Sequence, residues 1–229
     1  MKWKMFNHPL TDTSPQYGNN PPIRVESLSN IQSGAASNTH MIHLHNHSGT
    51  HIDAPRHFRD DGLAIADFPE DFWQFEEIFL LDLPKEADAL IAADDIEQHH
   101  GSIGACELLL IRTGHERYRD SDPDRYRLHN PGITPEAAHL LRTYKQLRAV
   151  GIDIISVTPY QNRVLGRMTH QAFFDARYGN EFILIEDLHL AGVEPPDVVL
   201  IEPVFKMAID GSPAIVMAIY TETMRPEDN

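Results

Sequence analysis

The sequence is poor in cysteine, in basic residues and in long apolar runs, and each shortage excludes a class of protein. A single cysteine, Cys106, excludes an internal disulfide and suits a buried apolar position better than a nucleophile. The sequence has only 19 Lys and Arg residues but 34 Asp and Glu residues. The resulting net charge of −15 disfavours nucleic acids and anionic membranes as partners. There is no apolar run of about 18 residues that could span a membrane, and the first ten residues lack a signal peptide's apolar core. We therefore expect a cytoplasmic protein.

The residues that are present are sufficient for one globular domain. The chain has 229 residues, 41% of them hydrophobic, which is typical of an ordinary globular protein with a substantial core. No internal repeat, low-complexity tract or long linker divides it. Residues 1–38 are rich in Pro, Asn, Ser and Gly and predict an irregular N-terminal arm with at most one short strand. We expect residues 1–229 to form a single domain.

Apolar runs and helix signals alternate along the rest of the chain, which predicts an α/β fold. Several of the runs are nearly continuous, as in strands that are covered on both faces. The predicted strands are Thr39–Leu44, Ile78–Leu83, Glu107–Thr113, Ile152–Val157, Glu181–Glu186, Val198–Glu202 and Ile215–Thr221. The clearest predicted helix is Pro135–Val150, which Thr134 can cap and Gly151 can terminate. Shorter helices are predicted over Asp94–His100 and Thr169–Tyr178.

Residues 45–58, HNHSGTHIDAPRHF, contain four histidines and an aspartate. This composition is typical of a site for a divalent metal ion. In a straight strand His47 and His51 would lie ~13 Å apart, too far for one ion with bonds of ~2.0–2.1 Å. Gly49 stands between them and gives the backbone the freedom to bend. We therefore predict that the chain turns at Gly49, so that His47, His51 and Asp53 converge on one metal ion.

An alternative is that these histidines merely line an exposed strand. We favour that interpretation for His43 and, less strongly, for His45. An exposed polar strand would not need Gly49 or Pro55 beside these histidines. Pro55 biases the residue before it toward an extended backbone. The longer set that ends at His57 is therefore predicted to be a metal site.

The pattern H-x-G-T-H-x-D-x-P-x-H at positions 47–57 resembles the signature of the cyclase/kynurenine formamidase family of metal-dependent hydrolases, and every fixed position is present. Weaker similarity in segments 8–15, 108–114, 149–157 and 184–193 extends the match over nearly the whole chain. The resemblance implies a single α/β domain of the swivelling β/β/α type, with a curved, barrel-like mixed sheet flanked by helices. It also implies a homodimer or a higher homo-oligomer.

The resemblance further implies a set of site residues. The implied ligands of one or two zinc ions, with manganese as the alternative metal, are His47, His51 and Asp53 for a first ion and Asp53, His57, His170 and Glu186 for a second. His57 would also carry the catalytic proton. Glu181 is an alternative to Glu186, which we prefer because it ends the apolar run FILI. His189 has no implied role and is expected at the surface.

These residues suggest a hydrolytic reaction. Two histidines and a carboxylate leave coordination positions for water, whose pKa falls toward ~7 on such an ion, and His57 can carry its proton to a leaving nitrogen. We expect Ser48 and Thr50 to support the ligands rather than act as nucleophiles, and Phe58 to form a wall of the substrate pocket.

The sequence therefore predicts a metal-dependent amide hydrolase acting on a small molecule. By the resemblance it would be an arylformamidase, which converts N-formylkynurenine to kynurenine and formate in tryptophan catabolism. One alternative is a hydrolase of a cyclic amide, imide or lactone such as isatin. The other is a non-catalytic metal-binding protein with the same fold.

Overall fold

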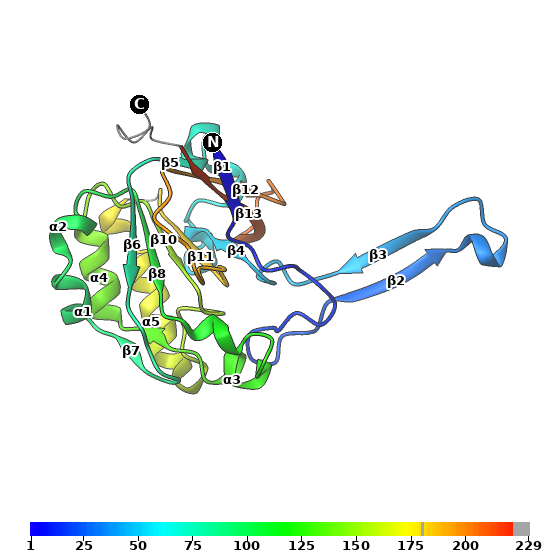
Figure 1. Ribbon diagram of the computed structural model, residues 1–229, viewed down its shortest axis with the longest axis horizontal. Helices are drawn as coiled ribbons and strands as arrows, with labels where there is room; N and C mark the ends of the chain where they lie inside the picture. Colours follow the sequence, from blue (N-terminus) through cyan, green and yellow to red (C-terminus); the bar gives the residue numbers. More distant parts are fainter. Residues whose placement is uncertain (180, 222–229) are drawn as a thin grey trace, which may run out of the picture.

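The computed structural model describes residues 1–179 and 181–221. Its main element is a curved, mixed sheet of nine strands in the order β5-β12-β13-β4-β11-β10-β8-β6, with β1 paired to β13 (Figure 1). These nine strands are β1 Lys2–Met5, β4 His51–Asp53, β5 Gln74–Phe75, β6 Ile78–Asp82, β8 Leu108–Arg112, β10 Ala149–Ile152, β11 Ile183–Glu186, β12 Val198–Pro203 and β13 Gly211–Tyr220. The α/β domain with a barrel-like mixed sheet that the sequence predicted is confirmed.

Helices cover one face of the parallel part of the sheet, beside β6, β8 and β10 (Figure 1). The α-helices are α1 Ala93–Glu97, α2 His100–Ile103, α3 Pro123–Leu128, α4 Pro135–Thr143 and α5 Arg163–Phe173. Strand β8 shows how the sheet is buried on both sides, because Leu109 packs in the cluster under the helices and Leu110 packs in the cluster on the opposite face. Burying a leucine side chain fully contributes roughly 1.5–3 kcal/mol. The continuous apolar run therefore stabilises two cores at once.

A long hairpin projects from the body of the molecule (Figure 1). It consists of β2 Arg24–Ser29 and β3 Thr39–His43, paired antiparallel, and nearly all of its residues are exposed. With β1, the first 38 residues thus hold two strands, one more than the composition predicts. The two remaining short strands, β7 Leu90–Ile91 and β9 Gly132–Ile133, pair with each other.

The prediction was wrong where an apolar run could form either a helix or a strand. The helix expected over Pro135–Val150 ends at Thr143, and residues 149–152 form β10 between β8 and β11. Thr134 does cap the helix, since its hydroxyl accepts the Ala137 N–H at 3.2 Å. Gly151 does not end a helix but lies inside the strand, where an added Cβ would meet Leu188 at 2.7 Å.

The prediction of a strand over Ile152–Val157 was also wrong, because only Ile152 belongs to one. The expected helix over Thr169–Tyr178 is α5, which begins six residues earlier at Arg163, and a separate 3-10 turn, Ala176–Tyr178. The other six predicted strands are present with shifted ends. Among the described residues, no helix is long and apolar enough to cross a membrane.

Candidate functional site

The short strand β4 lies at the centre of the site. It pairs antiparallel with both β11 and β13, and all three of its residues are buried. The register places His51 directly opposite Glu186 of β11, two residues before Asp53 on the same strand. Alternate residues of a strand share a face. The side chains of His51 and Asp53 therefore project on the same side of the sheet.

The predicted bend at Gly49 is confirmed. Gly49 has a φ of +66°, in the left-handed region, and a Cβ there would lie 2.6 Å from a Leu10 methyl group. The turn brings the ring of His47 back until its centroid lies 5.2 Å from that of His51. Ala54 is extended, as Pro55 predicts, with φ −98° and ψ 162°.

Five predicted ligands converge around Asp53. His47 Nδ1 lies 2.7 Å from Asp53 Oδ1, His51 Nε2 lies 3.4 Å from the same oxygen, and His170 Nε2 lies 3.4 Å from Oδ2. Glu186 closes the group, with its two oxygens 3.4 Å from His51 Nε2 and 3.7 Å from His170 Nε2. Two sets of donor atoms are compact enough to hold an ion: His47, Asp53 and His57, and His51, Asp53 and Glu186. Asp53 belongs to both sets, but they divide the other ligands differently from the two expected ions, since His57 groups with His47 and His51 groups with Glu186.

The far half of the site comes from α5 and β11. His170 lies in the last turn of α5 with only 3% of its surface exposed. Its Nδ1 lies 3.0 Å from the Thr158 hydroxyl, so Nε2 is directed at the carboxylates. Glu186 is 2% exposed, whereas Glu181 is exposed and lies outside the cluster. Geometry therefore favours Glu186 over Glu181.

The buried carboxylates give the site a strong preference for positive charge. Burial alone would raise the pKa of Asp53, but the neighbouring histidines outweigh it and hold that pKa well below its ordinary value. Burial would lower the pKa of His170, but Asp53 and Glu186 raise it to about 10. The same two carboxylates raise the pKa of His51. Imidazole nitrogens and buried carboxylate oxygens that face one another at such distances fit a divalent cation.

Asp210 is the member of the site that the sequence analysis missed. One of its oxygens, Oδ2, accepts hydrogen bonds from His57 Nδ1 at 2.7 Å and from His47 Nε2 at 2.9 Å. The next residue, Gly211, passes so close to His47 that a Cβ would lie 2.4 Å from its ring. In the sequence Asp210 and Gly211 suggest only a turn, because they are over 150 residues from the histidine motif.

The cluster opens into a cavity of about 300 Å³. Phe58 forms one wall, as predicted, and stacks on His170 with ring centroids 4.6 Å apart. Two arginines of α5, Arg163 and Arg167, also line the cavity, together with Tyr17. Within the part of the chain that the structure describes, neither arginine forms an ion pair.

The hydroxyl groups inside the motif are engaged in supporting contacts. Thr50 donates to the carbonyl of Asp187 at 2.6 Å, and Ser48 donates to the side chain of Gln16 at 2.8 Å. Neither contact presents the oxygen to the cavity as a nucleophile, which supports their expected structural role.

This fold and site define an α/β protein of the metal-binding type, in which the predicted ligands, four histidines and two buried carboxylates, line one cavity. The chain belongs to the cyclase family, because residues 6–159 match the family model described as "Putative cyclase". It is 27% identical over 213 residues to a kynurenine formamidase of Bacillus anthracis, covering 93% of this chain and 94% of that protein.

Two solved structures show the same fold. Isatin hydrolase A from Labrenzia aggregata superposes with a TM-score of 0.78 at 24% identity, covering 96% of this chain and 94% of that one. A predicted metal-dependent hydrolase from Bacillus stearothermophilus superposes with a TM-score of 0.70 at 24% identity, covering 95% and 97%. The family resemblance seen in the sequence is therefore confirmed, and the relatives named here are hydrolases.

Proposed function

We propose that the protein is a metal-dependent hydrolase that cleaves the C–N bond of an aryl formamide, with N-formylkynurenine as the leading substrate. The main support is the placement of His57 beside a cluster of metal-type ligands in a cavity of about 300 Å³. The kynurenine formamidase relative, aligned over nearly the full length of both chains, supports the substrate class.

The metal would be held by Asp53 and the ligands that surround it, His47, His51, His170 and Glu186, which leaves His57 for proton transfer. Zinc is the expected ion and manganese the alternative, with one or two ions per chain, since imidazole and carboxylate ligands suit both metals. When bound, such an ion would polarise the substrate carbonyl and acidify a water molecule.

His57 is placed to move a proton at the cavity. Asp210 holds Nδ1 at 2.7 Å, and among the described residues Nε2 has no hydrogen-bond partner. A carboxylate on Nδ1 fixes the tautomer in which Nδ1 carries the proton and Nε2 is the free base. Nε2 can then accept a proton from the attacking water and donate it to the departing nitrogen. Asp210 thus fixes the orientation of the His57 ring.

The arginine pair favours a substrate with an anionic group. Arg163 and Arg167 are one helical turn apart on α5, so both side chains lie on the same side of the helix, where they line the cavity. In a chain of net charge −15, two arginines without a carboxylate partner among the described residues are suited to bind one from outside. N-formylkynurenine carries such a carboxylate, whereas isatin does not.

The experiment is an assay of the purified protein, loaded with zinc or manganese, on N-formylkynurenine and on isatin. Release of formate from the first substrate supports the proposal, and replacement of His57 by Ala should abolish it while zinc stays bound. His129→Ala, which removes an exposed histidine elsewhere, is the matched control. Opening of isatin with N-formylkynurenine untouched would show a cyclic-amide hydrolase instead. Bound metal without turnover of either substrate would favour a metal-binding protein.

A further inference from the structure

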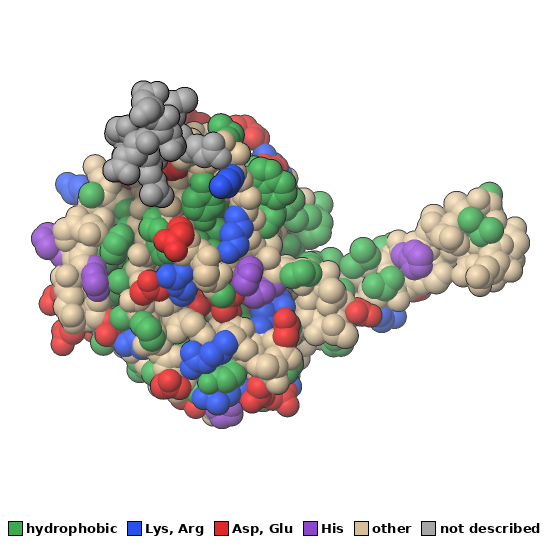
Figure 2. Space-filling view, in the orientation of Figure 1, with side chains coloured by type: hydrophobic (Ala, Val, Ile, Leu, Met, Phe, Trp, Pro, Cys, Tyr) green, Lys and Arg blue, Asp and Glu red, His purple; other side chains and the backbone are tan. Residues whose placement is uncertain are grey.

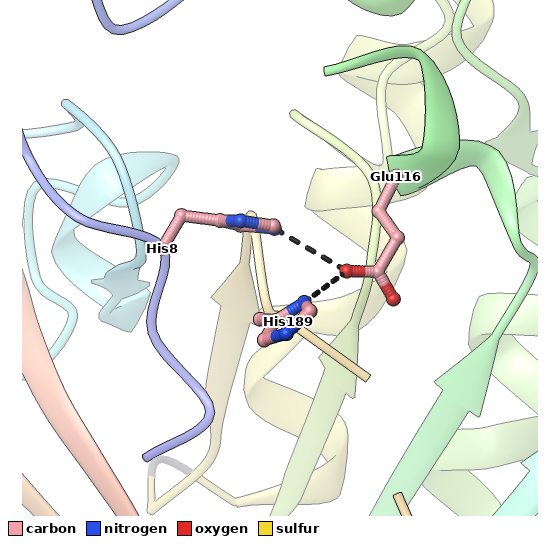
Figure 3. Close-up of side chains that lie close together, drawn as sticks. All are labelled: His8, Glu116 and His189. Carbon is pink, nitrogen blue, oxygen red and sulfur yellow. Dashed lines mark hydrogen bonds and ion pairs between the residues drawn. The ribbon is translucent and has the colours of Figure 1, made fainter. Parts of the chain in front are cut away.

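Outside the candidate active site, His8, Glu116 and His189 form a second compact group of metal-type ligands (Figure 3). They come from three separate segments: the stretch after β1, the 3-10 turn His115–Tyr118, and the loop after β11. His189 Nδ1 lies 2.7 Å from Glu116 Oε2, and His8 Nε2 lies 3.4 Å from the same oxygen. Both rings are thus directed at a single carboxylate oxygen.

The group is incomplete as a hydrogen-bond network. His8 Nε2 is buried and, among the described residues, has no hydrogen-bond partner; its contact with Glu116 is too long and too poorly directed to count as one. If Nε2 carries a proton, that proton is unsatisfied, and if it does not, its lone pair faces a carboxylate. Either state is costly for a buried polar atom. A cation placed among the three ligand atoms would remove the cost.

The surrounding backbone holds the three ligands in place. The other carboxylate oxygen of Glu116, Oε1, accepts the N–H of Leu190 at 2.9 Å, which fixes the orientation of the group. The N–H of His189 donates to the carbonyl of Phe6 at 2.8 Å, so the two histidine segments are joined directly. A cation would therefore bind with little rearrangement of the main chain.

The charge and exposure of the site also suit a cation. The nearby guanidinium of Arg119 is neutralised by Asp187, with two contacts of 2.8 Å. The side chain of His189 is 40% exposed, which leaves a path for an ion and a position for a water ligand. Two imidazoles and one carboxylate with an open position are a donor set typical of zinc and neighbouring transition metals rather than of calcium or magnesium.

We propose that His8, Glu116 and His189 bind one divalent transition-metal ion per chain, separate from the ion or ions of the candidate active site. The bound ion fastens the N-terminal segment to the loop that follows Glu186. Thr50 contacts both of these segments. Its hydroxyl oxygen lies 3.4 Å from the backbone nitrogen of His8, and the hydroxyl donates a hydrogen bond to the carbonyl of Asp187. We assign the bound ion no part in the hydrolytic reaction, because its ligands lie outside the cavity that would hold substrate.

The experiment compares zinc content after stripping with a chelator, reloading with excess zinc and desalting. Glu116→Gln keeps the shape of the side chain and the acceptor for Leu190 while it removes the charge, and His189→Ala removes a ligand. Both variants should retain one zinc ion fewer per chain than the parent. His129→Ala, which breaks an exposed pair with Asp88, should retain the parent's content. Circular dichroism of each variant checks that the chain is folded.

A combined variant and a diffraction measurement separate this site from the active site. Zinc lost in His47→Ala and zinc lost in Glu116→Gln should add in the double variant, because the two sites are independent. A crystal of the parent protein soaked in zinc should show an anomalous peak among the three side chains. Equal zinc content in the parent, Glu116→Gln and His189→Ala, or no peak at this position in the zinc-soaked crystal, would overturn the proposal.

Discussion

His57 Nδ1 lies 2.7 Å from Asp210 Oδ2, although the two residues are 153 positions apart in the chain. The carboxylate is half-buried, and its hydrogen bonds to His47 and His57 hold its pKa well below the ordinary value. It is therefore an anion at neutral pH and accepts a hydrogen bond from the protonated Nδ1 of His57. This relationship determines which nitrogen of His57 faces the cavity.

Replacement of Asp210 by Asn should lower kcat by about 10²–10⁴-fold, because a neutral amide no longer fixes the basic tautomer of His57. KM should change little. The measurement is steady-state kinetics on the substrate identified above, with zinc content determined in parallel, since Asp210 also contacts His47. Asp61→Asn, on an exposed carboxylate, is the control. An unchanged kcat would exclude an orienting role for Asp210.

Replacement of both Arg163 and Arg167 by Ala should raise KM for a carboxylate-bearing formamide by about 10–100-fold, the value of a charge-assisted hydrogen bond. A formamide without the carboxylate should be cleaved equally well by parent and variant. Arg125→Ala, on α3 away from the cavity, provides the control. If both substrates lost the same factor, the arginines would act on the fold rather than on the anion.

Metal binding at the candidate active site should weaken as the pH falls. In the metal-free protein the pKa of His170 is about 10, so its ring carries a proton at neutral pH that a cation must displace. The affinity should therefore rise by about tenfold per pH unit for each proton released. Calorimetric titration with zinc at pH 6 and pH 7.5, in two buffers of different ionisation enthalpy, measures the affinity and the number of protons released. An affinity that is independent of pH would show that the histidines are already neutral.

Asp187→Ala should destabilise the protein by about 3–5 kcal/mol, because the buried guanidinium of Arg119 loses its buried partner and keeps only the exposed Asp120 at 3.8 Å. Asp187 also accepts a hydrogen bond from Tyr126, and all three side chains are buried. Urea denaturation of parent and variant gives the free energy of unfolding. Glu70→Ala breaks the exposed pair with Lys206 instead and should have little effect. If both variants lost the same free energy of unfolding, burial of the Asp187–Arg119 pair would not be what makes it stabilising.

The projecting hairpin supports the expectation of a homodimer, and we propose that it contacts a second copy of the chain. Val25 and Ile42 are cross-strand partners that are 52% and 59% exposed, and apolar side chains continue along the arm (Figure 2). An isolated two-stranded hairpin is only marginally stable in water. The double substitution Val25→Glu and Ile42→Glu should convert a dimer of 26.0 kDa chains to monomer, as measured by light scattering. Thr39→Glu, on the opposite face of the same strand, should not, and a parent that is already monomeric would refute the proposal.

Local sequence was sufficient for the part of the site that lies within one turn of chain. Gly49 permits the left-handed backbone that turns His47 toward Asp53, and Pro55 favours the extended conformation of Ala54. The strands Ile78–Leu83 and Glu107–Thr113 were likewise predictable from short apolar runs bounded by polar residues. In each case the controlling interactions join residues that are neighbours in sequence.

Local sequence was insufficient where a pattern fitted two structures equally well. Residues 149–152 are apolar enough to extend the preceding helix, and only the gap between β8 and β11 makes them a strand. His170 could have been a surface residue at the start of a helix. Its burial depends on where α5 packs and not on the residues around it.

By itself, the sequence determined the family, the α/β class and the turn that gathers His47, His51 and Asp53, because these depend on backbone preferences over a few residues. The tertiary structure alone decided that Asp210 orients His57 and that His8 meets Glu116 and His189. Those side chains are brought together by strand register and loop packing across more than 70 residues. Local backbone preferences do not predict such distant contacts, because the packing of the whole sheet determines them.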